Sequence, residues 1–395
     1  MPPAPAAAES RPGPSDRERG DACPGALRLH PADDGALARV RLPGGLLTDR
    51  QALVLAGLAE RWGDGALELT SRGNVQLRGL PADSGAELGD ALRAAGLLPS
   101  ETHERVRNIV ASPLSGLDGR GYADVRAWVR ELDQRLCASP AAAGLAGLFL
   151  FALDDGRGDV AALDADVTLI ATPGGGALLR LGRAVTARRV AAGDEASAAL
   201  AAAEEFIAAA GAKAWFVRDA PELVDPGAEP LPPPTGTAPE PGRFDGGLVV
   251  GTRFGRLSAA QLRQLAAAAP ELRITPWRSV VLPGATGPAP AGLRTAPGSP
   301  WERATACTGA PGCAKSLADV RTDAARALDL AVEPGAPVHW SGCERRCGHP
   351  AGAWVDVLAT GAGYRVTAHR MSGPTSQDLT TEQMAEAVAE ARRTT

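Results

Sequence analysis

Two copies of one strand–helix–strand–strand pattern constrain the fold of this 395-residue chain more than any other feature of its sequence. The first copy predicts these elements at residues 37–42, 51–61, 67–70 and 74–77. The second copy predicts the same order at residues 248–251, 259–268, 272–275 and 279–282. Units of this size cannot bury their own apolar faces, so we expect the two copies to pack together about a pseudo-twofold axis.

Matching positions favour a true duplication over the alternative that any two such segments look alike. One offset of 205 residues relates three pairs: Thr70 and Thr275, Val75 and Val280, Leu77 and Leu282. Between the copies, residues 226–242 carry seven prolines, which cannot form a helix or a central strand. We therefore expect a stiff, extended linker between two halves of the chain.

Composition excludes several classes of protein. The net charge of −5 argues against nucleic-acid binding, which needs a surplus of basic residues. No apolar run reaches the ~18 residues of a membrane helix, and six cysteines are too few for a disulfide scaffold. We therefore expect a cytoplasmic protein with no membrane partner, in which the cysteines stay reduced.

Four of the six cysteines lie within a 41-residue window, at Cys307, Cys313, Cys343 and Cys347. Four thiolates in glycine-containing loops are the usual ligands of a [4Fe–4S] cluster, and also of structural zinc. Zinc prefers two to four residues between paired ligands, so the five residues between Cys307 and Cys313 favour the cluster. Zinc and unrelated buried cysteines remain open as alternatives.

These motifs resemble those of the nitrite/sulfite reductase family. The segments ACTGAPGC at 306–313 and SGCERRCGHP at 341–350 resemble its paired cysteine motif. RLPGG at 41–45 and TSRGNVQL at 70–77 resemble the signatures of its ferredoxin-like half-domain, and RNIV at 107–110 resembles its RN motif. The sequence around the cysteines is most similar to that of the precorrin-3B synthase branch of this family.

The resemblance implies an α+β fold, in which pseudo-twofold duplicated ferredoxin-like half-domains accompany reductase-type αβ domains. A disordered tail at 1–20 precedes half-domain 1 at 21–82 and the first αβ domain at 83–225. The linker at 226–242 then leads to half-domain 2 at 243–285. The second αβ domain, at 286–395, would carry the [4Fe–4S] cluster on Cys307, Cys313, Cys343 and Cys347.

The synthase branch implies an enzyme that hydroxylates precorrin-3A with dioxygen and closes a lactone in cobalamin biosynthesis. Its cofactors would be the cluster and a mononuclear non-haem iron. Electrons would come from a ferredoxin or flavoprotein and ultimately from NADH. One alternative is a sirohaem-dependent sulfite or nitrite reductase. However, residues 144–155 lack the lysines that such reductases carry there. A second alternative is a zinc-stapled, non-redox tetrapyrrole-binding protein.

A precorrin carries several carboxylates, which arginine binds bidentately without losing its proton. The matched motifs imply that the tetrapyrrole contacts arginine and amide side chains at Arg41, Arg72, Asn74, Gln76, Arg107 and Asn108. Arg278 joins them by its place in the repeat. Arg39 shares a strand face with Arg41, so either of the two can point inward. His349 is the best-placed ligand for a non-haem iron, and the sequence assigns no catalytic residue.

Overall fold

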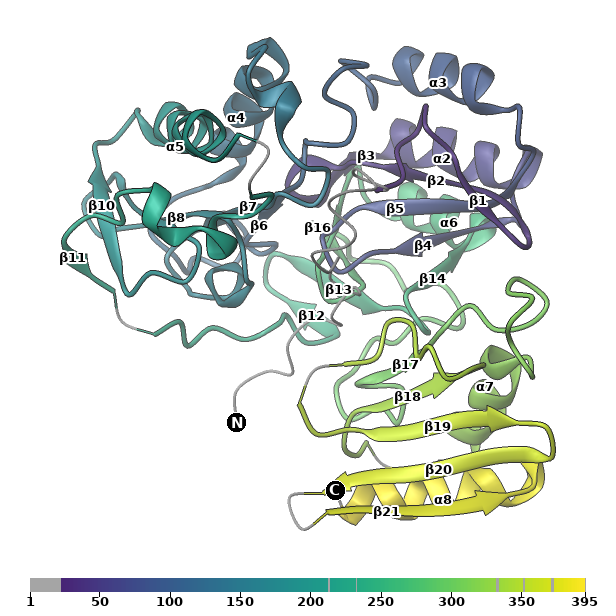
Figure 1. The fold of residues 1–395 in the computed structure, drawn as a ribbon. Helices are drawn as coiled ribbons and strands as arrows, with labels where there is room; N and C mark the ends of the chain where they lie inside the picture. Colours follow the sequence, from purple (N-terminus) through teal and green to yellow (C-terminus); the bar gives the residue numbers. More distant parts are fainter. Residues whose placement is uncertain are drawn as a thin grey trace.

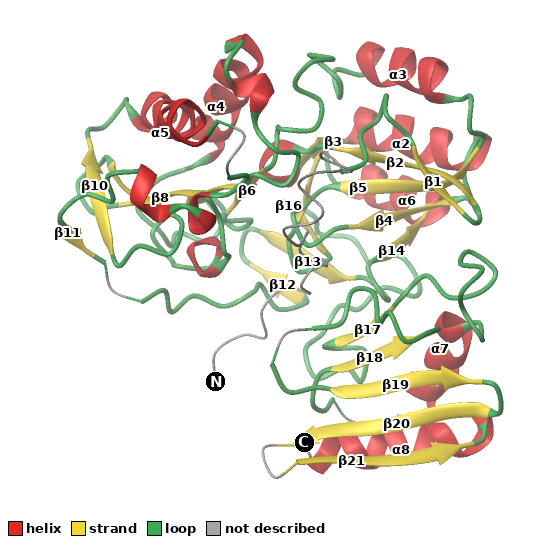
Figure 2. Ribbon diagram, in the orientation of Figure 1, coloured by secondary structure: helices red, strands yellow, loops and turns green. Residues whose placement is uncertain are grey.

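The computed structural model describes residues 23–211, 214–231, 233–331, 334–350, 352–370 and 373–394. The predicted tail at residues 1–20 lies outside these ranges. Within them the strands form four sheets, which group into three bodies, each with its own hydrophobic core (Figures 1 and 2). Mixed helices and sheets confirm the predicted α+β class.

Both copies of the repeat have the predicted order of elements. The first comprises β1 (His30–Ala32), β2 (Gly35–Val40), β3 (Leu46–Thr48), α2 (Asp49–Arg61), β4 (Ala66–Leu69) and β5 (Val75–Leu80). The second comprises β12 (Gly242–Phe244), β13 (Gly247–Gly251), β14 (Arg256–Ser258), α6 (Ala259–Ala268), β15 (Glu271–Ile274) and β16 (Ser279–Pro283). A further helix, α3 (Gly85–Ala94), follows the first copy.

Equivalent capping boxes begin the two helices. Thr48 accepts a hydrogen bond from the backbone of Gln51, whose side chain accepts one from the Thr48 backbone. Ser258 and Gln261 repeat this exchange at the start of α6. Each box satisfies backbone donors that a helix start would otherwise leave unpaired, and such a cap is typically worth ~1 kcal/mol.

The two copies exchange strands. The sheet of the first copy runs β1-β2-β5-β4-β14, and that of the second runs β12-β13-β16-β15-β3. Thus β14 pairs antiparallel with β4, and β3 pairs antiparallel with β15. Helices α2 and α6 pack together over one shared core, which confirms the expected pseudo-twofold arrangement. Neither copy has a complete sheet without the other.

Each copy also contains the same turn before its last strand. Thr70 Oγ1 accepts hydrogen bonds from the backbone of Arg72 and Asn74, and Thr275 Oγ1 accepts the equivalent pair two and four residues later. The turn needs a positive φ at its fourth residue, which is Gly73 (66°) in one copy and Arg278 (57°) in the other.

A six-stranded sheet forms the second body. Its strands run in the order β11-β10-β9-β8-β7-β6. Their bounds are β6 (Ile109–Ala111), β7 (Phe151–Asp154), β8 (Val167–Ala171), β9 (Ala177–Leu181), β10 (Thr186–Val190) and β11 (Glu229–Pro230). Helices α4 (Arg126–Ala138) and α5 (Glu195–Ala210) pack on one face (Figure 1). The edge strand β11 belongs to the proline-rich segment, which therefore lies along this body.

The third body contains the four clustered cysteines. Its strands are β17 (Ala304–Ala306), β18 (Val338–Ser341), β19 (Val355–Thr360), β20 (Gly363–Arg370) and β21 (Gly373–Leu379). The first three are parallel and the last two pair antiparallel. Helices α7 (Val320–Leu330) and α8 (Thr381–Thr394) pack against each other and share the core of this sheet. In none of the described segments is there a helix both long and apolar enough to cross a bilayer.

Buried carboxyl groups gather after β7. Asp154 accepts hydrogen bonds from the backbone of Gly156, Gly158 and Ala161. Asp159 Oδ1 accepts one from Ser112 Oγ at 2.6 Å, while its Oδ2 has no hydrogen-bond partner among the described residues. Burial, together with the nearby Asp154 carboxyl, raises the pKa of Asp159 to about 7.

This shift predicts that folding stability falls as the pH rises. The folded state binds the Asp159 proton more tightly than the unfolded chain does. Proton binding at Asp159 therefore contributes fully to the free energy of unfolding below pH ~4, and this contribution is lost towards pH ~7. Asp159→Asn should remove up to about 1.4 kcal/mol per pH unit from that slope. Chemical denaturation over this pH range measures it, and Asp83→Asn, at an exposed carboxyl, is the control. An unchanged slope in Asp159→Asn would contradict the assignment.

Candidate cluster and tetrapyrrole site

The fold brings the two cysteine pairs to one edge of a sheet. Cys307 directly follows β17, and Gly342-Cys343 directly follows the parallel neighbour β18. Since parallel strands end at the same edge, the two loops meet there. The Gly342 N–H donates to Cys307 Sγ at 3.2 Å. Such backbone donors stabilise thiolate ligands and the sulfides of a bound cluster.

The thiols differ in environment. Cys347 is exposed and the other three are half-buried. Burial raises the pKa of the Cys307 thiol, hydrogen bonds from Gly342 and Gly309 oppose that rise, and Cys347 adds to it. In the described ranges no three His, Cys, Asp or Glu side chains converge closely enough to hold a single ion. A group bound by all four thiolates would displace their protons on binding.

The Cys307–Cys313 loop is docked onto the first half-domain. Asp33 accepts a hydrogen bond from the Ala314 backbone at 2.8 Å. The neighbouring Asp34 holds Arg78 bidentately, at 2.9 and 3.0 Å, and Arg78 Nη2 approaches the Gly312 carbonyl at 3.5 Å. The turn between β1 and β2 therefore fixes the position of a loop that lies far away in the sequence.

A second connection runs from the same sheet to Cys307 itself. Arg39 donates from Nε and Nη2 to Gln76 Oε1, and Gln76 Nε2 lies 3.5 Å from Glu68 Oε2. Glu68 pairs with Arg321 of α7, whose Nη2 lies 2.6 Å from Oε1. Arg321 Nε then donates to the Cys307 carbonyl at 3.1 Å. Burial raises the pKa of Glu68, but Arg321 and Arg78 outweigh it, so the net pKa is lowered and the carboxylate stays charged.

Arg41 is a buried cation that pairs with no carboxylate in the part of the chain that the structure describes. Its side chain is 2% exposed and donates to the Arg105 carbonyl, the Gly147 carbonyl and Cys23 Sγ, all at 3.1–3.2 Å. Nη1 has no hydrogen-bond partner among the described residues. Burial lowers the pKa of Arg41 to about 10, and the charge of nearby Arg39 and Arg72 contributes.

Arg72 and Arg278 lie at the two repeated turns. The charge of Arg72 acts on Arg41 and also on the buried carboxyl of Asp166, whose pKa burial raises to about 6. Arg278 Nε donates to the Leu69 carbonyl at 3.3 Å, across the boundary between the two half-domains. The structure thus brings Arg39, Arg41 and Arg72 together and leaves Arg278 on the opposite copy.

Four other predicted site residues are engaged within the protein. Asn74 Oδ1 accepts from the Leu42 backbone, and its Nδ2 donates to Asn108, which in turn donates to Gly147. Arg107 binds Asp133 through two hydrogen bonds, and Gln76 accepts from Arg39. Asn74, Asn108 and Arg107 are buried. Asn74 and Asn108 therefore help to hold the loop at Gly147, whereas Arg107 connects the RNIV segment to Asp133 of α4 and to the Leu97 carbonyl.

Of the two histidines near the cysteine loops, one is exposed and one is buried. His349 is exposed, and its ring stacks on Trp354 with centroids 5.2 Å apart. His339, which the sequence did not single out, is buried below it, contacts Thr305 Oγ1 through Nδ1, and lies 6.0 Å from Trp354. Burial, with the nearby His349, lowers the pKa of His339 to about 3, so it is neutral.

Glu68, Arg321, Asp33 and Asp34 complete the surroundings of the cysteine loops, and sequence reasoning missed them. Each is a charged residue on an ordinary strand, turn or helix, with no motif of its own. The only available signal was that Arg321 follows the cysteine motif within the same segment.

Comparison with known proteins shows which family the chain resembles. Residues 30–95 match the nitrite/sulfite reductase ferredoxin-like half domain. A precorrin-3B synthase of Sinorhizobium sp is 29% identical over 380 residues, which span 88% of this chain and 82% of that protein. The chain is therefore similar to members of the nitrite/sulfite reductase family, over most of its length in the case of the synthase. This confirms the resemblance read from the motifs.

Other members of the family match more locally. The ferredoxin–nitrite reductase of Synechococcus elongatus is 38% identical over 105 residues, 26% of this chain and 20% of that protein. The structure of the Mycobacterium tuberculosis NirA protein is similar over 90% of this chain and 79% of its own, with a TM-score of 0.61 and 19% identity. That likeness concerns the fold alone and supports the duplicated half-domain architecture.

The four-thiolate assignment predicts loss of iron on removing one ligand. Cys307→Ser should lower the iron bound per chain at least about tenfold, since a hydroxyl is a poor ligand for soft metal centres. Metal analysis of anaerobically purified protein measures this, with Cys137→Ser on α4 as the control. Iron retained in full by Cys307→Ser would contradict the site. Zinc instead of iron in the unmutated protein would favour a structural zinc site.

The connection through Arg321 predicts a second effect. Arg321→Met removes the hydrogen bond to the Cys307 carbonyl and leaves Glu68 with less neighbouring positive charge. Loss of such an outer contact typically costs about 10–100-fold in metal affinity, so bound iron should pass to a chelator faster. Arg326→Met, on the same helix but 74% exposed, is the matched control. Equal rates in both variants would show that the ion pair does not support the loop.

Proposed function

We propose that this protein is a precorrin-3B synthase, which uses dioxygen to hydroxylate precorrin-3A and to close a lactone. The observation that carries the proposal is the buried guanidinium of Arg41, which has no carboxylate partner among the described residues. A buried cation of this kind is costly unless an anion compensates it. A tetrapyrrole with several carboxylates supplies that anion.

Other contacts support the same reading. Arg39 and Arg72 lie close enough to Arg41 to lower its pKa, so a second and a third cation face the same region. Three contacts connect Arg41 to Gln76, through Cys23 and Arg39. From Gln76 the connection continues through Glu68 and Arg321 to the Cys307 carbonyl. We infer that the ring lies between the arginines of the first half-domain and the cysteine edge.

The proposed reaction balances with an external reductant. One atom of dioxygen enters the substrate, and the other leaves as water after two electrons and two protons are added. A [4Fe–4S] cluster, when bound by the four cysteines, supplies electrons one at a time. A partner protein would deliver them, and a ferredoxin or flavoprotein that draws on NADH has this property. Arg41 and Arg72 would bind and orient the substrate carboxylates.

A sirohaem-dependent reductase is the second candidate, because the nitrite reductase relatives share the half-domain. One feature disfavours it. The segment where reductases carry lysines is apolar here, with Phe149, Leu150 and Phe151 buried. The Leu150 N–H is bonded to the Asp166 carboxyl, so the backbone around it is already engaged. No cationic side chain in residues 144–155 is available to hold a small anion.

Substrate turnover tests the proposal directly. Reduced, cluster-loaded protein incubated with precorrin-3A and dioxygen should yield a product heavier by one oxygen atom, detected by mass spectrometry. Labelled dioxygen should transfer its label to the product, and anaerobic incubation is the control. Reduction of sulfite or nitrite without any oxygenated product would instead support the reductase.

Substrate binding tests the arginine assignment. Arg41→Met and Arg72→Ala should each weaken tetrapyrrole binding by about 10–100-fold, because each loses a charge-assisted hydrogen bond of roughly 1.5–3 kcal/mol. Fluorescence or absorption titration measures the affinity. Arg135→Met, at an exposed residue paired within α4, should bind normally. Affinity unchanged in both test variants would remove these arginines from the site.

A further inference from the structure

A cavity lies on the six-stranded body, away from the cysteine edge. It encloses about 610 Å³, within the range of small-molecule sites. Its walls come from the turn between β9 and β10 and from two short 3₁₀ helices, η4 (Val217–Asp219) and η5 (Pro221–Leu223). Nothing in the proposed reaction uses this cavity.

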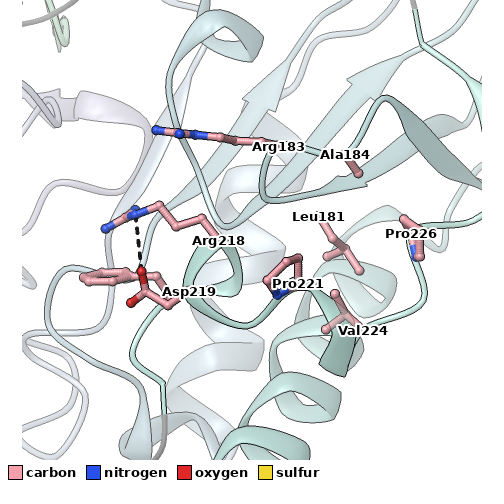
Figure 3. A pocket seen from close by; sticks show the side chains of 9 residues that line it. Leu181, Arg183, Ala184, Arg218, Asp219, Pro221, Val224 and Pro226 are labelled. Carbon is pink, nitrogen blue, oxygen red and sulfur yellow. Dashed lines mark ion pairs between the residues drawn. The ribbon is translucent and has the colours of Figure 1, made fainter. Parts of the chain in front are cut away.

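The cavity has a cationic end and an apolar end. Figure 3 shows the side chains of Arg183 and Arg218 extending to the same side. The opposite side is formed by the apolar residues Leu181, Pro221, Val224 and Pro226. A ligand that fits both ends must carry an anion on a hydrophobic stem.

Buried contacts hold the cationic end in shape. Asp166 accepts hydrogen bonds from Val217 N at its carboxyl and from Gly182 N at its carbonyl, at 2.9 and 2.8 Å. One buried residue therefore fixes both walls. Arg218 lies flat over the Phe216 ring, with its guanidinium carbon 3.9 Å from the centroid, which limits the directions it can take.

Both arginines have an acidic neighbour with which a ligand carboxylate would have to compete. Arg183 donates to both carboxylate oxygens of Asp164, at 2.9 and 2.8 Å, but its side chain is 64% exposed, so solvent screens this pair. Asp219 lies 4.0 Å from Arg218, at the limit of an ion pair. A ligand carboxylate between the two arginines would gain two charged donors and exclude water from the Phe216 face.

We propose that this cavity binds a carboxylate on a hydrophobic stem, with Arg183 and Arg218 on the carboxylate and Leu181 and Val224 on the stem. Two sources share this chemistry. One is a carboxylated side arm of a bound tetrapyrrole, because Asp166, which holds the cavity wall at Val217, also lies within range of the Arg72 charge. This form rests on the proposed function. The other is a free organic acid, which does not.

Two probes separate these sources. Hexanoate and coproporphyrin are titrated into the full-length protein by calorimetry, with hexylamine as the charge-reversed control. Arg218→Met should weaken binding of at least one carboxylate probe about tenfold or more. Val224→Asp should do the same by placing a carboxylate at the apolar end. Arg183→Met, at an exposed position, keeps the test valid if Arg218→Met disturbs folding.

The outcomes are distinct. If Arg218→Met weakens coproporphyrin and Arg41→Met does so as well, the cavity receives a tetrapyrrole arm. If only hexanoate depends on Arg218, the cavity takes a separate organic acid, and the proposal stands whether or not precorrin-3A is oxygenated. If neither probe responds to Arg218→Met, Arg183→Met or Val224→Asp, or if hexylamine binds equally well, the proposal is overturned.

Discussion

Each ferredoxin-like half of this protein depends on a strand that the other half supplies. Strand β3 completes the sheet of the second copy and β14 completes that of the first, while α2 and α6 cover one common core. Strand pairing and helix packing therefore resist separation together, because separating the copies would expose two sheet edges and the shared apolar face. The half-domains form one rigid platform, and the αβ bodies are arranged around it (Figure 1).

The platform matters because the site is assembled from several parts of the chain. The β1–β2 turn holds the first cysteine loop through Asp33, and β4 holds α7 through the ion pair between Glu68 and Arg321. These contacts connect the half-domain sheet to the cysteine edge of another sheet. A shift of the platform would therefore move the arginine cluster and the cysteine loops relative to each other.

Charge inside the protein is distributed unevenly. The chain is acidic overall, yet Arg41 is buried with two further arginines nearby and pairs with no carboxylate among the residues that the structure describes. On the six-stranded body the opposite occurs, since Asp154, Asp159 and Asp166 are buried and burial raises the pKa of each. The first arrangement is suited to an anionic ligand, whereas the second holds backbone N–H groups of the β7 and β8 loops in place.

The sequence by itself determined the local elements, the duplication and the identity of the cysteine motif. Period-two and helical patterns, and capping boxes such as Thr48 with Gln51, depend only on neighbouring residues, so α2, α6 and the repeated strands were predictable. Tertiary structure alone decided the strand exchange and the role of Glu68 and Arg321. It also decided that Arg107 pairs with a carboxylate while Arg41 donates to two backbone carbonyls and a thiol. These depend on which distant surfaces meet, and identical arginines acquire different roles according to whether a carboxylate such as Asp133 lies opposite them.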